Sequence, residues 1–419
     1  MSFFERFKNR SENVAYKLRS NNKIIPSIIV FLNALIGFPF SLFRLLTKST
    51  IKTSEPKRIL VIRADRIGDM ILTTPIFKSL KERYPHSNVT CMASTLSSEL
   101  VEGNPHIDEL LVYDPPWFDR KKGKKEFHDY LNVLRLIRNR RFDMAIDLRG
   151  NIFNFFFLMF LAGIQQRVSF DAAFGAFLLT CAVPFEKNKH ETDYFFDIVK
   201  ALGGKSEPEP QAALILAEGE REYAEKYFYS QNITQDDVII ALHPGAGENR
   251  IYKRWPEDRY CELGKVLVKR FDAKIIITGS KAEIDLASRI KNQIGKNAIL
   301  AAGEICHLKH LAAVLKKCYV CIGTSTGTIH VAAAVGTPVI VLCGPEDPRR
   351  WRPLGDNHIL IEKEVPCRPC REDTCRYDGR CLKLISPKCV LKVIEPLLAS
   401  KIKHSSSIHQ NLGKIAGIF

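Results

Sequence analysis

Short apolar runs alternate with amphipathic segments along most of this chain, which restricts it to one class of fold. Apolar residues fill the runs 58–63, 88–93 and 143–148, which are typical of buried strands. The segments 70–84 and 127–141 have the residue spacing of helices. Because alternating strands and helices build parallel sheets covered on both faces, the sequence predicts an α/β fold.

The alternation is interrupted once, at the segment 203–210, which is rich in Gly and Pro, and it then restarts. A chain of 419 residues is also long for a single core. We therefore predict two Rossmann-like doubly wound domains, residues 56–210 and 211–400, facing a central cleft at the carboxyl ends of their strands. The later predicted strands are 212–216, 238–242, 273–278, 299–301, 319–322 and 339–342, and a core helix is predicted at 151–164.

The first 55 residues form a separate basic and apolar extension. Residues 1–58 hold 11 Lys and Arg against 3 Asp and Glu, within a total net charge of +16. Residues 24–43 carry no charge. A basic end beside an apolar segment indicates contact with an anionic membrane surface. We predict a helix that lies in the membrane surface, with a single membrane span or an extra helix packed on the first domain as alternatives.

The segment 321–334 predicts the end of a buried strand, a tight turn and the start of a helix. Thr324, Ser325 and Thr326 can each cap a helix, so an ordinary Ser/Thr cap is one interpretation. The other interpretation is a binding site for phosphate or pyrophosphate, because a helix start offers free N–H groups and positive potential. His330, on the first turns of this helix, could face a ligand or pack inside the domain.

Two further loops follow predicted strands and carry residues capable of chemistry. In the loop 65–69, Asp69 near a helix start could be either a cap or a general base. In the loop 243–247, Gly245 and Gly247 allow close approach of an anion, which Lys253 or Arg254 could neutralise. The alternative for this second loop is a surface turn with one packed Trp.

These loops, in this order, resemble glycosyltransferase family 9, the heptosyltransferases that build the lipopolysaccharide core. The resemblance covers about residues 57–395 and rests on the motifs at 62–75, 243–246, 253–256, 327–333 and 341–345. It implies the GT-B fold, an ADP-activated heptose donor, inversion at the anomeric carbon and no required metal. The first domain would then bind the acceptor and the second the nucleotide sugar.

The resemblance also implies roles for individual residues. Asp69 matches the catalytic base and Lys253 matches the lysine at the donor phosphates. Ser325 is a departure, because family members commonly carry an acidic residue there. The acceptor side is assigned Asp65, Arg66 and Gly68, and the donor side Gly245, Ala246, Glu283, Ser325, Thr326, Gly327, Thr328 and His330.

We therefore expect an enzyme that extends a lipopolysaccharide core or another lipid-linked saccharide from the cytoplasmic face of the inner membrane. The alternative is a GT-B protein that binds sugar nucleotides but has lost catalytic power, which the departure at Ser325 favours. Nucleic-acid binding is motivated only by the basic pI of 9.3, and the sequence has no recognisable module of interleaved basic and aromatic residues.

A cluster of cysteines lies near the carboxyl end of the second domain. Cys367, Cys370, Cys375 and Cys381 could hold a structural Zn²⁺, although their spacing is not that of a standard zinc ribbon. Free thiols in a loop are the alternative. Residues 401–419 are expected to form a flexible tail.

Overall fold

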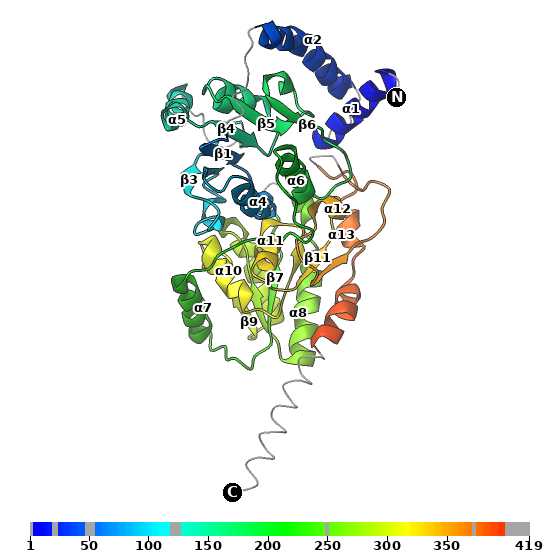
Figure 1. Cartoon of the computed structure of the whole chain (residues 1–419). Coiled ribbons are helices and arrows are strands. Elements are labelled where there is room, and N and C mark those ends of the chain that lie inside the picture. The colour runs from blue at the N-terminus through cyan, green and yellow to red at the C-terminus, as the bar shows by residue number, and fades with distance from the viewer. Residues whose placement is uncertain are drawn as a thin grey trace. The chain divides into compact units, whose positions relative to one another are not determined.

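The computed structural model describes residues 3–18, 24–46, 55–117, 127–247, 251–370 and 374–398. The predicted tail, 401–419, lies outside these ranges. The chain divides into two compact units (Figure 1). The first unit consists of Met1–Ala217 with Arg349–Gly355, and the second of Glu218–Pro348 with Asp356–Phe419. The division at 217/218 lies close to the expected boundary at 210.

The first unit is built on a six-stranded parallel sheet in the order β3-β2-β1-β4-β5-β6. Strand β1 is apolar apart from its two ends and is buried from its second residue onward, which fits a central strand covered on both faces. The strands are β1 (Arg58–Arg63), β2 (Asn88–Ala93), β3 (Glu109–Val112), β4 (Met144–Asp147), β5 (Gln166–Phe170) and β6 (Cys181–Val183).

The helix predicted at 70–84 is in fact two helices, α3 (Ile67–Thr73) and α4 (Pro75–Arg83). Pro75 has no N–H for helix α3 to use, and it occupies the first turn of α4, where none is needed. The predicted core helix at 151–164 is shorter and wider, a π-helix at Asn154–Phe160. The other helical segments of this unit include η1 (Ser98–Leu100), α5 (Phe127–Arg140), η3 (Ala176–Leu178), α6 (Glu191–Ala201) and α12 (Pro348–Trp351).

The second unit repeats the same architecture with the sheet order β12-β11-β10-β7-β8-β9, again all parallel. Its strands are β7 (Ile239–His243), β8 (Lys274–Ile277), β9 (Ala298–Leu300), β10 (Val320–Thr324), β11 (Val339–Leu342) and β12 (His358–Ile361). Its helical segments include α7 (Glu218–Ser230), η4 (Ile251–Lys253), α8 (Glu257–Phe271), η5 (Lys281–Glu283), α9 (Ile284–Ile294), α10 (Leu308–Lys316), α11 (Gly327–Ala334) and α13 (Arg380–Lys383).

Two segments differ from their sequence-based interpretation, one in the core of the second unit and one at the end of the first. Trp255, which the surface-loop interpretation left as a single packed ring, is buried against Tyr260 and donates to the Ile385 carbonyl at 2.9 Å. The predicted strand at 212–216 belongs to the first unit and forms no ladder there; Ala213 N donates instead to Thr74 Oγ1 of the same unit at 2.9 Å.

Both sheets have the strand order of a Rossmann fold, which confirms the predicted α/β class. In each sheet the chain leaves the first strand in one direction and resumes on its other side with the fourth. That reversal lies between β1 and β4 in the first unit and between β7 and β10 in the second. Ligands of open α/β sheets bind beyond the carboxyl ends of these two strands, where the following loops diverge.

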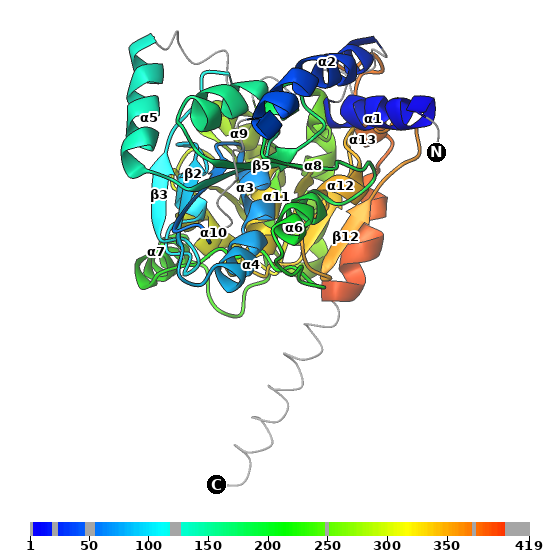
Figure 2. The ribbon, with the colours of Figure 1, turned by 45° about the horizontal axis from the view of Figure 1, so that its top comes forward.

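Helices α1 (Phe3–Leu18) and α2 (Ile24–Leu46) pack against each other and belong to the first unit (Figures 1 and 2). Asn33 of α2 donates to the Ala173 carbonyl at 2.8 Å and accepts from Gly175 N at 3.0 Å. None of the helices in the described ranges is long and apolar enough to cross a membrane.

Candidate active site

The loop predicted to hold a catalytic base follows β1, at the point where the first sheet reverses. Helix α3 begins at Ile67, and Arg66 is its N-cap residue. The Arg66 side chain makes no capping hydrogen bond. Asp69 then falls in the first turn, and it is not the N-cap residue. Asp65 and Arg66 lie between the strand and the helix, while Gly68 lies within the first turn. The acceptor-side residues and the predicted base therefore share one short connection.

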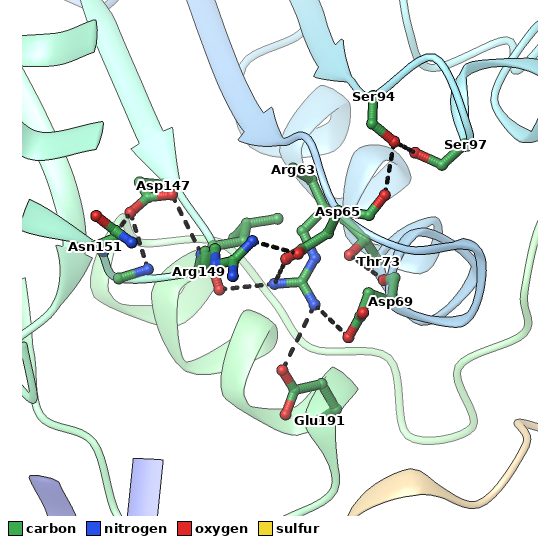
Figure 3. Close-up of polar contacts among 12 residues, drawn as sticks. Arg63, Asp65, Asp69, Thr73, Ser94, Ser97, Asp147, Arg149, Asn151 and Glu191 are labelled. Atoms are coloured by element: carbon green, nitrogen blue, oxygen red, sulfur yellow. Dashed lines mark hydrogen bonds and ion pairs between the residues drawn. The ribbon is translucent and has the colours of Figure 1, made fainter. Parts of the chain in front are cut away.

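A single buried arginine organises the polar groups of this loop (Figure 3). The Arg63 guanidinium lies 3.2 Å from Asp69 Oδ1, 3.5 Å from Asp65 Oδ2 and 3.6 Å from Glu191 Oε1. It also donates to the Leu148 carbonyl at 3.1 Å and stacks over the Phe195 ring. One cation thus faces three carboxylates from α3, the β1 loop and α6.

The ionisation of Asp69 follows from this arrangement. Burial and the neighbouring carboxylate of Asp65 raise the pKa of Asp69 to about 6, against the opposing effect of Arg63 and with a further increase from Glu191. A general base works best when its pKa lies near the operating pH. Asp69 is therefore ionised at neutral pH and basic enough to accept a proton from a hydroxyl.

Further charged groups surround the cluster, and the sequence alone did not indicate them as functional. Arg149, after β4, binds Asp65 Oδ1 at 2.7 Å, and Arg350 binds Glu191 Oε2 at 2.7 Å. Burial acts to raise the pKa of Glu191, but Arg350 and Arg63 outweigh it and the pKa is lowered. A sequence signal existed for Arg63, a charge at the end of an otherwise apolar strand. The sequence contains no such signal for Glu191 or Arg350, because their partners are distant in the chain.

Asp147 at the end of β4 shapes the neighbouring loop. Its carboxylate accepts hydrogen bonds from Gly150 N at 2.9 Å, Asn151 N at 3.3 Å and Asn154 Nδ2 at 2.9 Å. Burial raises its pKa. Because these bonds fix the β4 loop, Asp147 holds Arg149 beside Asp65.

In the second unit, Glu283 holds the loop that follows β7. Its Oε1 accepts from Ala246 N at 2.9 Å and Gly247 N at 3.0 Å, while Oε2 accepts from the Ser280 N–H and hydroxyl, both at 2.9 Å. A Cβ on Gly245 would lie 2.4 Å from this carboxylate, so any larger residue would displace Glu283 from its hydrogen bonds. Glu283 is buried and positions the loop, and its assigned contact with a donor stays a prediction.

The predicted phosphate site lies at the start of α11, after β10. Thr326 is the N-cap, but its side chain makes no capping hydrogen bond, so an ordinary Ser/Thr cap is not what forms here. Among the described residues, neither Thr324 Oγ1 nor Thr326 Oγ1 has a hydrogen-bond partner, although both atoms are buried. Buried hydroxyls usually find partners. Gly327 and Thr328 supply the first N–H groups of the helix, and this end is therefore suited to an anion with acceptor oxygens.

Lys253 lies at the same helix start, paired with a carboxylate that the sequence did not indicate. Its Nζ donates to Glu346 Oε1 at 2.5 Å, and Ser325 Oγ donates to Glu346 Oε2 at 3.3 Å. Glu346 follows β11, the neighbour of β10 in the sheet. His330 is 5% exposed and lies one turn along α11, where its contact with a ligand remains a prediction.

In the described part of the cysteine-rich segment, the four cysteines considered for zinc are not gathered around one point. Within the described ranges, no three His, Cys, Asp or Glu side chains lie where they could hold a metal ion. Cys381 packs into the core, Cys375 Sγ accepts from Gly379 N at 3.1 Å, and Cys370 is held through its backbone N–H by the Pro345 carbonyl. The arrangement fits free thiols in a structured loop rather than Zn²⁺ at Cys367, Cys370, Cys375 and Cys381.

Two Rossmann-like units, each with polar groups gathered where its sheet reverses, define a glycosyltransferase of the GT-B class. The model of the family "Glycosyltransferase family 9 (heptosyltransferase)" matches residues 130–380. The chain belongs to this family.

Similar proteins include lipopolysaccharide heptosyltransferase 2 of Salmonella typhimurium, which is 25% identical over 357 residues, or 82% of this chain and 99% of the relative. The Escherichia coli protein of the same name is 25% identical over 81% of this chain and 98% of its own length. Among solved structures, a family 9 glycosyl transferase from Veillonella parvula is 25% identical, with a TM-score of 0.73 over 82% of this chain and 98% of that one. The E. coli ADP-heptose lps heptosyltransferase II gives 0.65 at 22% identity, over 82% and 99% of the two chains.

Proposed function

We propose that this enzyme moves a heptose from ADP-heptose to a lipopolysaccharide core or another lipid-linked saccharide, with inversion and without a required metal. The relatives named lipopolysaccharide heptosyltransferase support the sugar and the acceptor. The structural relative named ADP-heptose lps heptosyltransferase II supports the donor. The observation that carries the proposal is the partly buried carboxylate of Asp69, which lies 3.2 Å from the Arg63 guanidinium and has a pKa of about 6.

The proposed reaction is a single displacement. Asp69 takes the proton of the acceptor hydroxyl as its oxygen forms the new bond to the anomeric carbon, and the bond from that carbon to the diphosphate breaks. Lys253 and the N–H groups at the start of α11 stabilise the negative charge on the leaving ADP. Since attack and departure occur on opposite faces of the anomeric carbon, its configuration inverts.

The test is release of ADP in the presence of ADP-heptose and a lipopolysaccharide-core acceptor. The Asp69→Asn variant should lose turnover while retaining ADP affinity, because Lys253 and α11 are unchanged. Asp143→Asn is a matched control: this carboxylate accepts from Lys57 N and Arg58 N at the opposite end of β1. Normal turnover in Asp69→Asn would refute the assignment of the base.

A second candidate is a protein that binds sugar nucleotides without transferring the sugar. The serine at position 325 and the pairing of Lys253 with Glu346 favour it. It predicts calorimetric binding of ADP-heptose by the wild type and no ADP release above the spontaneous rate. Any ADP release that depends on both an acceptor and Asp69 rules it out.

We also propose that the extension attaches the enzyme to an anionic membrane surface through one face of α2. Ile24, Ile28, Phe31 and Leu35 recur at helical spacing and are all more than 45% exposed. The opposite face carries Asn33, which is hydrogen-bonded to the body of the first unit. A helix fixed along one side presents its other side to the lipid, as in-plane membrane helices do.

Membrane binding is tested by sedimentation of the full chain with vesicles containing anionic phospholipid. Replacing Phe31 and Leu35 together by Asn should release the protein into the supernatant, because the apolar stripe loses two of these four exposed side chains. Tyr229→Asn, which alters an exposed aromatic ring (85%) on α7, is the matched control and should sediment like the wild type. Undiminished sedimentation of the double variant would contradict the assignment of this face.

A further inference from the structure

The start of α11 already holds an anion that belongs to the protein. The two oxygens of Glu346 are both engaged, one with Lys253 Nζ at 2.5 Å and one with Ser325 Oγ at 3.3 Å. The Glu346 side chain is 19% exposed and that of Lys253 is 10% exposed. This is a largely desolvated ion pair placed where a diphosphate is proposed to bind.

A carboxylate in this position weakens diphosphate binding. It neutralises the cation that would bind the phosphates, and it repels them directly over a short distance. The same helix start offers buried hydroxyls at Thr324 and Thr326 that have no hydrogen-bond partner within the described parts of the chain. The site therefore offers a cation and hydroxyl groups that can bind a diphosphate. It also holds the Glu346 carboxylate, which could bind only another part of the ligand.

That group is held in place by several contacts. Arg368 Nη2 donates to the Glu346 carbonyl at 3.4 Å, and Cys370 N donates to the carbonyl of the preceding Pro345 at 2.7 Å. The cysteine-rich segment thus fixes the backbone that presents Glu346. A carboxylate held in this way only accepts hydrogen bonds, and the part of a sugar nucleotide that donates them next to the phosphates is the hydroxyl-bearing sugar.

We propose that Glu346 selects the donor by accepting hydrogen bonds from hydroxyls of the transferred sugar. This inference rests on the proposed function. When the diphosphate binds, Lys253 turns from Glu346 Oε1 to a phosphate oxygen, and the freed Oε1 accepts a hydroxyl of the sugar. Ser325 keeps Oε2 oriented. Glu346 is thus a specificity residue that favours the intact sugar nucleotide over ADP.

The experiment compares calorimetric affinities for ADP-heptose and for ADP in the full chain. Glu346→Gln should lower the preference for ADP-heptose over ADP at least 10-fold, while ADP itself binds as well as or better than in the wild type. Ser325→Ala should lower the preference less, since the carboxylate stays but loses its anchor. The matched control is Glu362→Gln, which removes the half-exposed carboxylate bound to the same Arg368 and should change neither affinity.

Each other outcome overturns the inference in a recognisable way. If Glu346→Gln raises the affinities for ADP and ADP-heptose equally, the carboxylate only occupies the phosphate site in the absence of ligand and does not contact the sugar. If neither affinity changes, Glu346 contacts no part of the donor. If Glu346→Gln does not fold, an unchanged preference in Ser325→Ala refutes the proposal. Failure of the wild type to bind ADP would overturn the proposed function itself, whereas binding with an unmoved preference overturns only the role of Glu346.

Discussion

Replacing Glu191 by Gln should shift the acidic limb of the pH–rate profile to lower pH. The catalytic form needs ionised Asp69, so kcat/KM of the wild type should fall as the pH drops through about 6, its pKa. Glu191 stays ionised over this range because its own pKa is lowered, mainly by Arg350 and Arg63 against the effect of burial. Its negative charge is one of the causes that raise the pKa of Asp69.

The size of the shift follows from the shared arginine. Arg63 Nη2 lies 3.2 Å from Asp69 Oδ1 and 3.6 Å from Glu191 Oε1, so the two oxygens are no more than about 7 Å apart. At an effective dielectric constant of about 20, two unit charges at that distance repel by about 2.4 kcal/mol, equivalent to roughly 1.7 pKa units. Because Arg350 neutralises part of the Glu191 charge, we expect a shift of about one unit.

The assay is the initial rate of ADP release between pH 4.5 and 8, with folding of the variant checked by thermal melting at each pH. Asp143→Asn removes a carboxylate from the same unit at the far end of β1 and should leave the limb in place. An acidic limb that stays near pH 6 in Glu191→Gln, or moves upward, would refute the electrostatic account of Asp69.

Three other predictions follow from the same contacts. Asp69→Asn should reduce kcat/KM about 10²–10⁴-fold in the ADP-release assay, with ADP affinity unchanged by calorimetry. Gly245→Ala should lower the free energy of unfolding measured in urea by about 1–3 kcal/mol, because the new Cβ would lie 2.4 Å from Glu283. Gly219→Ala is the control: its Cβ would meet nothing within 4 Å, so the stability should not change. Burial lowers the pKa of Lys17 to about 7. Its charge therefore destabilises the folded state fully below pH 7, and this destabilisation disappears as the pH rises towards 10.5. Lys17→Met should raise the melting temperature more at pH 6 than at pH 10, and an equal gain at both would contradict this.

The sequence predicts most strands of both sheets because nearly all of those strands are buried on both faces. An apolar run such as that of β1 or β10 has no other favourable location in a globular protein. Three strands, β5, β6 and β12, were not predicted. Gln166–Phe170 mixes polar and apolar residues, Cys181–Val183 is only three residues long, and His358–Ile361 is mostly not buried. The segment 212–216 gives the opposite error, since Leu214 and Leu216 are buried without a ladder while Ile215 stays 43% exposed.

The candidate site divides in the same way. Groups in the loops after β1, β7 and β10 can be located from sequence, because the strand ends that carry them can be located. Their partners cannot, since Glu191 reaches Arg63 from α6 and Glu346 reaches Lys253 from the loop after β11. Likewise, the uncharged run 24–43 predicts an apolar helix, but only the bonds of Asn33 reveal which face is turned to the protein.

The basicity of Asp69 depends on opposing influences, and a second variant can separate them. Burial and Asp65 raise its pKa, Arg63 lowers it, and the contribution of Glu191 is smaller than that of Arg63. Removing Arg63 and Glu191 together, as Arg63→Met with Glu191→Gln, takes away one positive and one negative charge, which limits the damage to folding. The larger influence lost is the lowering one, so the acidic limb should move above pH 6, opposite to the shift in Glu191→Gln alone. If both variants move the limb in the same direction, Arg63 does not control the ionisation of Asp69, and the base must be sought elsewhere in the cluster.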